Sequence, residues 1–402
     1  MNILFLTISI INDINESGIY TDLMRKFQKE GHHVYIVSPL ERRFKKSTML
    51  IQKDNFNLLR VKSLNFQKTN IIEKGLGTLL IEYIYLAAVE KYFSAISFEL
   101  IIYSTPPITF TKVVKRIKKR DNSISYLLLK DIFPQNALDL GIIKKHSFIH
   151  HYFRSKELEM YAVSDFIGCM SPANVEYLRK HNPEINPLII EVNPNSVELM
   201  DKFISNEEKD IIRKQYDLPI DKPIFIYGGN LGKPQGIDFI INILDTNKEN
   251  NDTFFVIIGS GIEFPKIKKW FIKNKPTNAK LLSFLPKQEY DRIVQSCNVG
   301  MIFLDNRFTI PNYPSRLLPY LEFKMPVLLA TDLNTDIGLD AENNGFGFWC
   351  ESGNIESFND KIYLLSKNQE LIQLMGKAGY NYLVENFTVN KSYSIIMKHL
   401  KN

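Results

Sequence analysis

Cysteine is scarce in this sequence of 402 residues, and the three that occur (Cys169, Cys297 and Cys350) lie far apart. An odd number at this spacing fits neither a disulfide framework nor the close cysteine pairs that hold zinc. No Asp-x-Asp pair occurs as a carboxylate site for a divalent cation. We therefore expect a protein of the reducing cytoplasm that has no resident metal and no cofactor.

Uninterrupted apolar stretches of membrane-spanning length are also missing. The most apolar segment, 76–96, is broken by Glu82, Glu90 and Lys91. These charges argue against a membrane-spanning helix and favour a buried helix. The alternative is a helix that lies in the membrane interface.

No combination of Ser, His and Asp or of Cys and His emerges that would form a nucleophilic site. His32 and His33 follow a glycine in an expected turn, and His146, His150 and His151 lie in a basic stretch without nearby acidic residues. We expect these histidines to face solvent.

Acidic residues are under-represented in the first half of the chain. Residues 1–196 carry 26 Lys and Arg against 19 Asp and Glu, whereas the whole chain has a net charge of +6. The basic residues concentrate in 42–46, 112–120 and 144–145, with Phe44, Phe148 and Tyr152 nearby. Such patches fit an anionic membrane surface or nucleic acid, and a solvated helix face is the alternative. We favour the membrane and expect no nucleic-acid partner.

Short runs of β-branched and aromatic residues alternate with helical patterns along the whole chain, which is typical of a parallel sheet with crossover helices. The length is suited to two domains. The sequence predicts an α/β fold with two Rossmann-like doubly wound domains at 1–200 and 201–385, facing each other across a cleft, and a C-terminal helix at 386–402. Because ligands bind at the carboxyl ends of parallel strands, we expect one site between the domains.

Two glycine-containing turns of the second half follow predicted strands. In the segment 227–236, Gly228 and Gly229 would let backbone amides close on a phosphate, and Lys233 would add charge. Gly259 stands in a similar turn, and Gly18 opens the first predicted helix. For each turn the alternative is a purely conformational role.

The segment 311–322 has the features of an anion site. We predict Ser315 as the N-cap of a helix and Arg316 as its first residue, with the guanidinium near the free amides. Glu322 follows two turns later on the same face, where its carboxylate suits a diol. The alternative is a loop, a surface helix and a core strand.

Lys130 and Asp131 end an otherwise apolar strand, so we expect them to point into the first crevice. Asp131 is a candidate for contacting an acceptor hydroxyl, and a helix-capping aspartate is the alternative.

Together the motifs resemble glycosyltransferase family 4, retaining enzymes of the GT-B fold. The resemblance covers nearly the whole chain and rests on Gly228-Gly-Asn-Leu-Gly-Lys-x-x-Gly236, Ile258-Gly-x-Gly261, Ser283-Phe-Leu-Pro286 and Pro314-Ser-Arg316 with Glu322. The segments 102–110, 128–141 and 193–195 are similar to a bacterial subset that builds O-antigen or capsule repeats and includes N-acetylfucosamine transferases.

The resemblance implies roles for particular residues. Arg316 and Lys233 would bind the donor diphosphate, Glu322 would bind the ribose hydroxyls, and the segment 283–288 would flank the base. Together with the strand-end pattern, this makes Arg316, Lys233 and Asp131 our candidates for catalysis, and Lys130 and Asp131 our candidates for acceptor binding. The C-terminal helix would cross back onto the first domain. The expected donor-binding residues are Gly18, Gly228, Gly229, Asn230, Lys233, Gly259, Ser283, Leu285, Pro286, Asn312, Ser315, Arg316, Leu317 and Glu322.

Two positions depart from the family pattern. Asn230 stands where an Arg is frequent, and Pro314 stands where many members carry a Glu that contacts the donor sugar. Asn312 is a weak substitute for that Glu.

These features predict a retaining, metal-independent enzyme that moves a sugar, such as an N-acetylated deoxyamino sugar, from a UDP-linked donor to a lipid-linked saccharide. It would act at the inner face of the cytoplasmic membrane in surface polysaccharide synthesis. The alternatives are a nucleotide-sugar 2-epimerase of the same architecture and a non-catalytic nucleotide-sugar-binding subunit.

Overall fold

The computed structural model describes the whole chain except residues 67, 68, 70, 200–202 and 401–402, and except the side chains of residues 71, 72 and 74. It divides into an N-terminal unit, Met1–Glu198 with Thr388–Asn402, and a C-terminal unit, Leu199–Phe387. The boundary that we expected at 200/201 lies outside the described residues, as do residues 401–402 of the expected last segment. The other expected boundary, 385/386, lies just before Thr388.

The N-terminal unit is built on one eight-stranded sheet with the order β3-β4-β2-β1-β5-β6-β7-β8. All neighbours are parallel except β3 and β4, which are antiparallel. The strands are β1 (Asn2–Leu6), β2 (His33–Glu41), β3 (Met49–Lys53), β4 (Phe56–Ser63), β5 (Leu100–Ser104), β6 (Ile124–Leu129), β7 (Phe166–Cys169) and β8 (Ile190–Val192).

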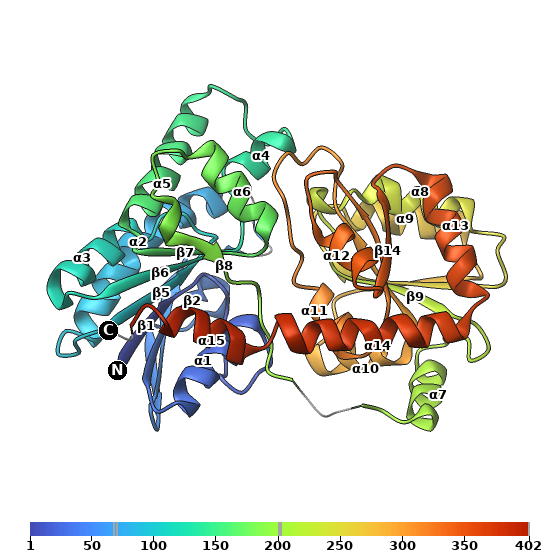
Figure 1. Cartoon of the computed structure of the whole chain (residues 1–402), viewed down its shortest axis with the longest axis horizontal. Helices are drawn as coiled ribbons and strands as arrows, with labels where there is room; N and C mark the ends of the chain where they lie inside the picture. The colour runs from blue at the N-terminus through green and yellow to red at the C-terminus, as the bar shows by residue number, and fades with distance from the viewer. Residues whose placement is uncertain (67–68, 70, 200–202, 401–402) are drawn as a thin grey trace. The chain divides into compact units, whose positions relative to one another are not determined.

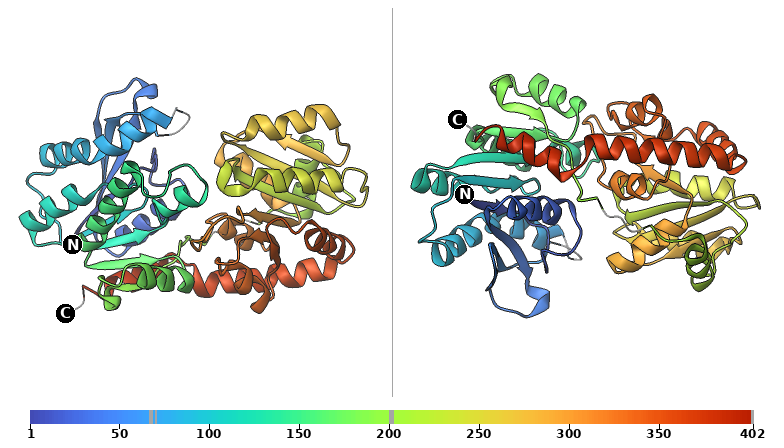
Figure 2. Two further views of the ribbon diagram at one scale, coloured as in Figure 1. Left: turned by 90° about the horizontal axis from the view of Figure 1, so that it is seen from above. Right: turned by 60° about the horizontal axis from the view of Figure 1, so that its bottom comes forward.

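Helices cover both faces of this sheet (Figures 1 and 2). On one face, Met24 and Phe27 of α1 and Ile396 and Met397 of α15 are buried together with alternate strand residues such as Phe5. On the other face α2, α3 and α5 pack side by side. The helices are α1 (Ile19–Lys29), α2 (Ile71–Tyr92), α3 (Thr111–Asp121), α4 (Gln135–Asp139), α5 (Phe148–Val163), α6 (Pro172–His181) and α15 (Val389–Met397), with short 3-10 turns at Arg42–Phe44 and Pro187–Ile189.

The C-terminal unit contains a parallel six-stranded sheet with the order β11-β10-β9-β12-β13-β14. The strands are β9 (Ile224–Asn230), β10 (Phe254–Ser260), β11 (Ala279–Leu282), β12 (Val299–Phe303), β13 (Val327–Thr331) and β14 (Gly347–Glu351). The helices are α7 (Asn206–Gln215), α8 (Ile237–Thr246), α9 (Phe264–Asn274), α10 (Lys287–Ser296), α11 (Leu317–Glu322), α12 (Ile337–Asn343), α13 (Ile355–Ser366) and α14 (Gln369–Asn386), with a 3-10 turn at Lys233–Gln235.

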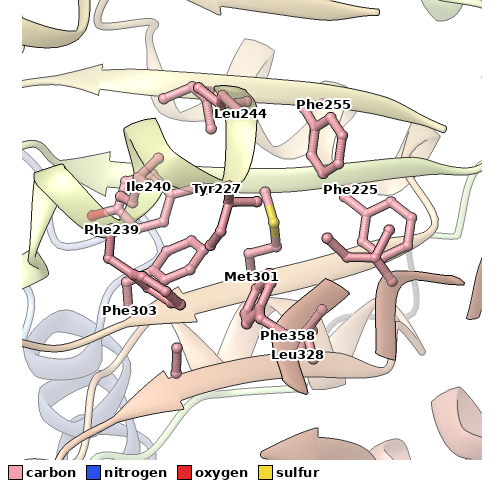
Figure 3. Packing of buried hydrophobic residues seen from close by; sticks show 14 of the residues in the cluster. Phe225, Tyr227, Phe239, Ile240, Leu244, Phe255, Met301, Phe303, Leu328 and Phe358 are labelled. Atoms are coloured by element: carbon pink, nitrogen blue, oxygen red, sulfur yellow. The ribbon is translucent and has the colours of Figure 1, made fainter. Parts of the chain in front are cut away.

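Aromatic and aliphatic side chains pack together in the core of this unit (Figure 3). Phe225 and Tyr227 point to the same face of β9 because side chains alternate along a strand, and they meet Phe255 and Phe303 of the flanking strands. Phe358 of α13 lies 5.4 Å from Phe303, measured between ring centroids. The core therefore fixes β9 and β12 as neighbours at the centre of the sheet.

The predicted α/β fold with two doubly wound parallel sheets is confirmed, apart from the antiparallel β3. The prediction that the two sheets face each other across a cleft stays a prediction. No helix in the described part of the chain combines the length and apolarity needed to cross a membrane.

Candidate functional site

The centre of the C-terminal sheet is a topological switch point. The chain runs from β9 outward through β10 and β11 on one side, and then returns through β12 to β14 on the other. Ligands of doubly wound proteins bind outside the carboxyl ends of the strands at such a point. The loops that leave β9 and β12 at this point are 231–236 and 304–316, and they contain four of the predicted donor-binding residues, Lys233, Asn312, Ser315 and Arg316.

Gly228 and Gly229, which we expected in the turn after a strand, lie within β9 itself, where they are held by close packing and by few side chains. The hydroxyl of Tyr320 accepts the amide of Gly228 at 3.2 Å and donates to the carbonyl of Ile226 at 3.2 Å. Gly229 has φ of +140°, and a Cβ there would lie 2.5 Å from Nη2 of Arg316. The backbone conformation favours glycine at this position, and a Cβ there would displace the end of the Arg316 side chain.

The turn that follows β9 leads into α8. Oε1 of Gln235 accepts the side-chain amide of Asn230 at 3.1 Å and the amide of Gly232 at 3.2 Å. Lys233 is exposed, and its side chain has no hydrogen-bond or ion-pair partner among the described residues. The turn thus presents one unpaired cation near the switch point.

Gly259 has a packing role. A Cβ at this residue would lie 1.9 Å from the carbonyl oxygen of Gly229, so β9 and β10 come together only because position 259 lacks a side chain. This contact explains the glycine without a ligand, and its predicted part in donor binding stays a prediction.

Arg316 is surrounded by tyrosines. Its guanidinium carbon lies 4.5 Å from the ring centroid of Tyr227, whose hydroxyl donates to the carbonyl of Asn230 at 2.6 Å. Burial acts to lower the pKa of Arg316, but Tyr227, Tyr320 and Tyr290 together outweigh it and raise that pKa, so the group is a permanent cation. Its Nη1 is buried and has no hydrogen-bond partner. A buried unpaired guanidinium nitrogen is costly, and an anionic oxygen would satisfy it.

The predicted start of the next helix was wrong. Ser315 is exposed and caps nothing, since α11 begins at Leu317 and its N-cap residue is Arg316. The reason is Pro319, which has no amide hydrogen to donate to the carbonyl of Ser315. That carbonyl accepts the amide of Leu318 at 3.2 Å instead, in a tighter turn.

The structure places the other residues of this segment within α11. Leu317 is fully buried and belongs to the core, whereas Glu322 is the last helical residue and is 6% exposed.

Asn312 is held by a network that the sequence did not predict. Its amide donates to Oγ1 of Thr335 at 3.0 Å, and Oγ1 of Thr335 donates to Oδ2 of Asp332 at 2.9 Å. Burial raises the pKa of Asp332, although its hydrogen bonds oppose this shift. Asp332 follows β13 directly. A polar residue at a strand end is a signal from which Asp332 could have been found in the sequence. We infer that it fixes the loop before Arg316.

Ser283, Leu285 and Pro286 connect the edge strand β11 to α10, and Ser283 and Pro286 are exposed. Tyr290, one turn into α10, lies against Gly228, since a Cβ on Gly228 would be 2.2 Å from the Tyr290 hydroxyl. Burial raises the pKa of Tyr290 to about 12, so its hydroxyl stays neutral. The predicted base-flanking segment is therefore connected through α10 to Gly228.

In the N-terminal unit, Lys130 and Asp131 lie at the carboxyl end of β6 as predicted from the strand pattern. Oγ1 of Thr105 accepts their amides at 2.8 and 3.0 Å. Nζ of Lys130 donates to the carbonyl of Asn193 at 3.1 Å, and burial lowers the pKa of Lys130 to about 7. Oδ1 of Asp131 accepts from Asn136 at 2.6 Å. The N-cap residue of α4 is Pro134, and Asp131 lies three residues before it.

Gly18 is the N-cap residue of α1, and its amide donates to Oδ1 of Asp22 at 2.9 Å. The buried Asp22 also pairs with Arg25 at 2.6 Å and accepts the amide of Glu198 at 3.0 Å. The amide of Gly18, a residue that we expected to bind the donor, is thus already bonded within this unit.

Comparisons with known proteins show what the chain is similar to. Residues 208–382 match the family described as "Glycosyl transferases group 1". The chain is 20% identical to the "Probable glycosyltransferase WbjE" of Pseudomonas aeruginosa over 386 residues, covering 93% of this chain and 91% of the relative. It is 29% identical over 99 residues to the "Putative colanic acid biosynthesis glycosyl transferase WcaI" of Escherichia coli K12, covering 25% and 23% of the two chains.

Solved structures share the fold of the whole chain. A sucrose-phosphate synthase from Thermosynechococcus elongatus superposes with a TM-score of 0.76 at 14% identity, covering 100% of this chain and 98% of that one. The Anabaena protein HepE in complex with UDP superposes with a TM-score of 0.69 at 12% identity, covering 100% and 99%. At these identities the likeness establishes the fold class, two parallel-sheet α/β domains of the GT-B type.

Proposed function

We propose that this chain, a glycosyltransferase whose residues 208–382 match the Glycosyl transferases group 1 family, transfers a sugar from a UDP-linked donor to a lipid-linked saccharide. The observation that carries the donor half of this proposal is the buried, unpartnered Nη1 of Arg316 at the switch point of the C-terminal sheet. The complex of HepE with UDP and the name of the WcaI protein support a nucleotide-sugar donor and polysaccharide synthesis.

The leaving group of such a reaction is a nucleotide diphosphate, on which negative charge develops as the bond to the sugar breaks. In the proposed mechanism Arg316 and the exposed Lys233 neutralise that charge, so the proposed reaction needs no metal ion. Glu322 binds the ribose hydroxyls, for which a carboxylate is a suitable acceptor.

The reaction is proposed to retain the configuration of the sugar. The acceptor hydroxyl attacks from the face that the diphosphate leaves, a bond forms between its oxygen and the anomeric carbon, and the bond to the phosphate oxygen breaks. The proton of the hydroxyl passes to the departing phosphate. Lys130 and Asp131 are the proposed acceptor contacts, at the carboxyl end of β6.

The finer parts of the proposal concern the sugar and the place of action. We propose an N-acetylated deoxyamino sugar as the transferred group, in a bacterial O-antigen or capsule pathway, at the inner face of the cytoplasmic membrane. The resemblance to the O-antigen and capsule subset supports these assignments, as does the basic character of residues 1–196.

Release of UDP is the decisive measurement. We would incubate the protein with a panel of UDP-sugars, with and without lipid-linked saccharides, and measure free UDP and the recovered sugar. UDP release that requires acceptor supports transfer. An isomerised donor sugar would indicate the epimerase, and binding without turnover would indicate the binding subunit.

Arg316→Ala tests the site in the same assay. Loss of a charge-assisted hydrogen bond of roughly 1.5–3 kcal/mol should lower kcat/KM for the donor at least about tenfold with little change in Tm. The control is Lys377→Ala, which removes an exposed cation of α14. Normal transfer by Arg316→Ala would contradict the assignment.

A further inference from the structure

The helix α2 exposes apolar side chains where a surface helix is normally polar. Its inward face buries Ile81, Tyr85 and Val89. A second row of apolar residues, spaced as one helix face at i, i+3, i+4 and i+7, points outward. The exposed fractions in this row are 50% for Leu76, 36% for Leu79, 45% for Leu80 and 53% for Tyr83.

The neighbouring helix α3 exposes a row of cations with the same spacing. Lys112, Lys115, Arg116 and Lys119 are exposed, while Val113, Val114 and Ile117 are buried against the sheet. Lys115 and Lys119 have no hydrogen-bond or ion-pair partner among the described residues. The two rows are in contact, because Nζ of Lys112 lies 4.0 Å from the ring centroid of Tyr83.

The beginning of α5 continues this surface with the same chemistry. Phe148 is 86% exposed and Ile149 is 54% exposed, and Lys144 and Lys145 precede them in the chain. No acidic residue occurs between Asp139 and Glu157. Figure 1 shows α2, α3 and α5 on the same side of the sheet, opposite α1 and α15.

We propose that these three segments, called the α2–α3–α5 face, bind the surface of an anionic lipid bilayer. Apolar side chains bordered by lysine and arginine are the features of proteins that lie in a membrane interface, where the apolar groups enter the headgroup region and the cations meet lipid phosphates. The apolar row of α2 favours a bilayer over nucleic acid, which would offer it no apolar partner.

The inference rests on the proposed function in one respect, since a lipid-linked acceptor lies in a membrane. It assigns the docking surface to the N-terminal unit, the unit that also contains Lys130 and Asp131. An enzyme docked in this way would meet its lipid-linked acceptor by diffusion along the membrane surface.

Vesicle sedimentation of the full chain tests the proposal. The probes are phosphatidylcholine vesicles and vesicles of phosphatidylcholine with phosphatidylglycerol, each at low and high salt. We expect binding to the anionic vesicles, weakened by salt because the charges are exposed. Equal binding to both compositions, or to neither, would overturn the proposal.

Two double variants test the two rows separately. Lys115→Gln with Lys119→Gln should weaken binding by about thirtyfold, since each cation near an anionic surface contributes about 1 kcal/mol and 1.4 kcal/mol corresponds to tenfold. The control is Lys269→Gln with Lys273→Gln, which removes two exposed, unpaired lysines at the same spacing on α9. Equal effects of the two pairs would contradict the assignment to α3.

For the apolar row, Leu76→Ser with Leu80→Ser should abolish most of the binding. The matched control replaces Leu364 and Leu374, which are 45% and 68% exposed on α13 and α14, by serine. If the wild type is instead a dimer that the Leu76 and Leu80 variant dissociates, without vesicle binding, the face is a self-contact and the proposal is wrong.

The failure of this inference is distinguishable from the failure of the proposed function. Transfer to a detergent-solubilised acceptor does not need the bilayer, so the double variants should keep it while losing vesicle binding. Vesicle binding by a protein that releases no UDP would leave the docking surface in place and remove the proposed reaction.

Discussion

A methyl group added at Gly229 tests the position of the Arg316 guanidinium. The substitution Gly229→Ala has two consequences, because the residue has φ of +140° and its Cβ would lie 2.5 Å from Nη2 of Arg316. The backbone must accept strain, and the guanidinium must move away from its place above Tyr227. Gly345→Ala provides the comparison, since Gly345 has φ of +66° but open space where its Cβ would stand.

The two variants should lose similar stability. A non-glycine residue at such φ costs roughly 1–3 kcal/mol, and a domain of this size loses about 2–4 °C of Tm per kcal/mol. Both should therefore melt about 2–12 °C below the wild type. Only Gly229→Ala displaces Arg316, so it alone should lose the hydrogen bond to the diphosphate, roughly 1.5–3 kcal/mol, or about 10- to 150-fold in Kd for UDP.

Titration calorimetry with UDP, at a temperature well below both melting transitions, measures this difference without knowledge of the sugar. Thermal unfolding of the same samples shows whether the two substitutions cause a comparable loss of stability. If both variants bind UDP equally well, or lose affinity equally, the guanidinium of Arg316 is not the donor contact that we propose.

Two further predictions concern buried ionisable groups. Glu322→Gln keeps the shape of the side chain and should raise the KM for the donor roughly tenfold or more with little change in Tm; an unchanged KM would exclude ribose binding by Glu322. Burial lowers the pKa of Lys130 to about 7 from the usual 10.5. Between pH 7 and pH 10.5, Lys130 therefore binds more protons in the unfolded chain than in the folded one. The free energy of unfolding should rise with pH in that range. Thermal unfolding measured from pH 7 to pH 9 should show this rise in the wild type and less of it in Lys130→Met.

The sequence was informative where local patterns decide the structure. The short apolar runs, of which 224–228 and 327–330 are examples, indicated a parallel sheet because both faces of a buried parallel strand are apolar. It failed at β3, whose residues are half-exposed or exposed. An edge strand of this kind buries no face and leaves no periodic signal.

The site was predicted in its composition more than in its geometry. Arg316 was recognised as a site residue, but its position at the start of α11 was predicted wrongly. Pro319 lies four residues after Ser315 and has no amide hydrogen, so a regular first turn cannot form from Ser315. The aromatic surroundings of Arg316 come from Tyr227, Tyr290 and Tyr320, which lie far apart in the chain. Only the fold brings them together, although Tyr227 directly precedes the glycine pair.

The approach of Gly259 to the carbonyl of Gly229 changes how mutagenesis of this protein should be interpreted. A screen that scores only activity would mark Gly259 as essential, since any side chain there forces β9 and β10 apart and moves the turn that follows. The loss would be transmitted through strand spacing, without contact between residue 259 and a substrate. Residues in the second strand of the sheet therefore need a binding measurement and a folding measurement together before they are assigned to the active site.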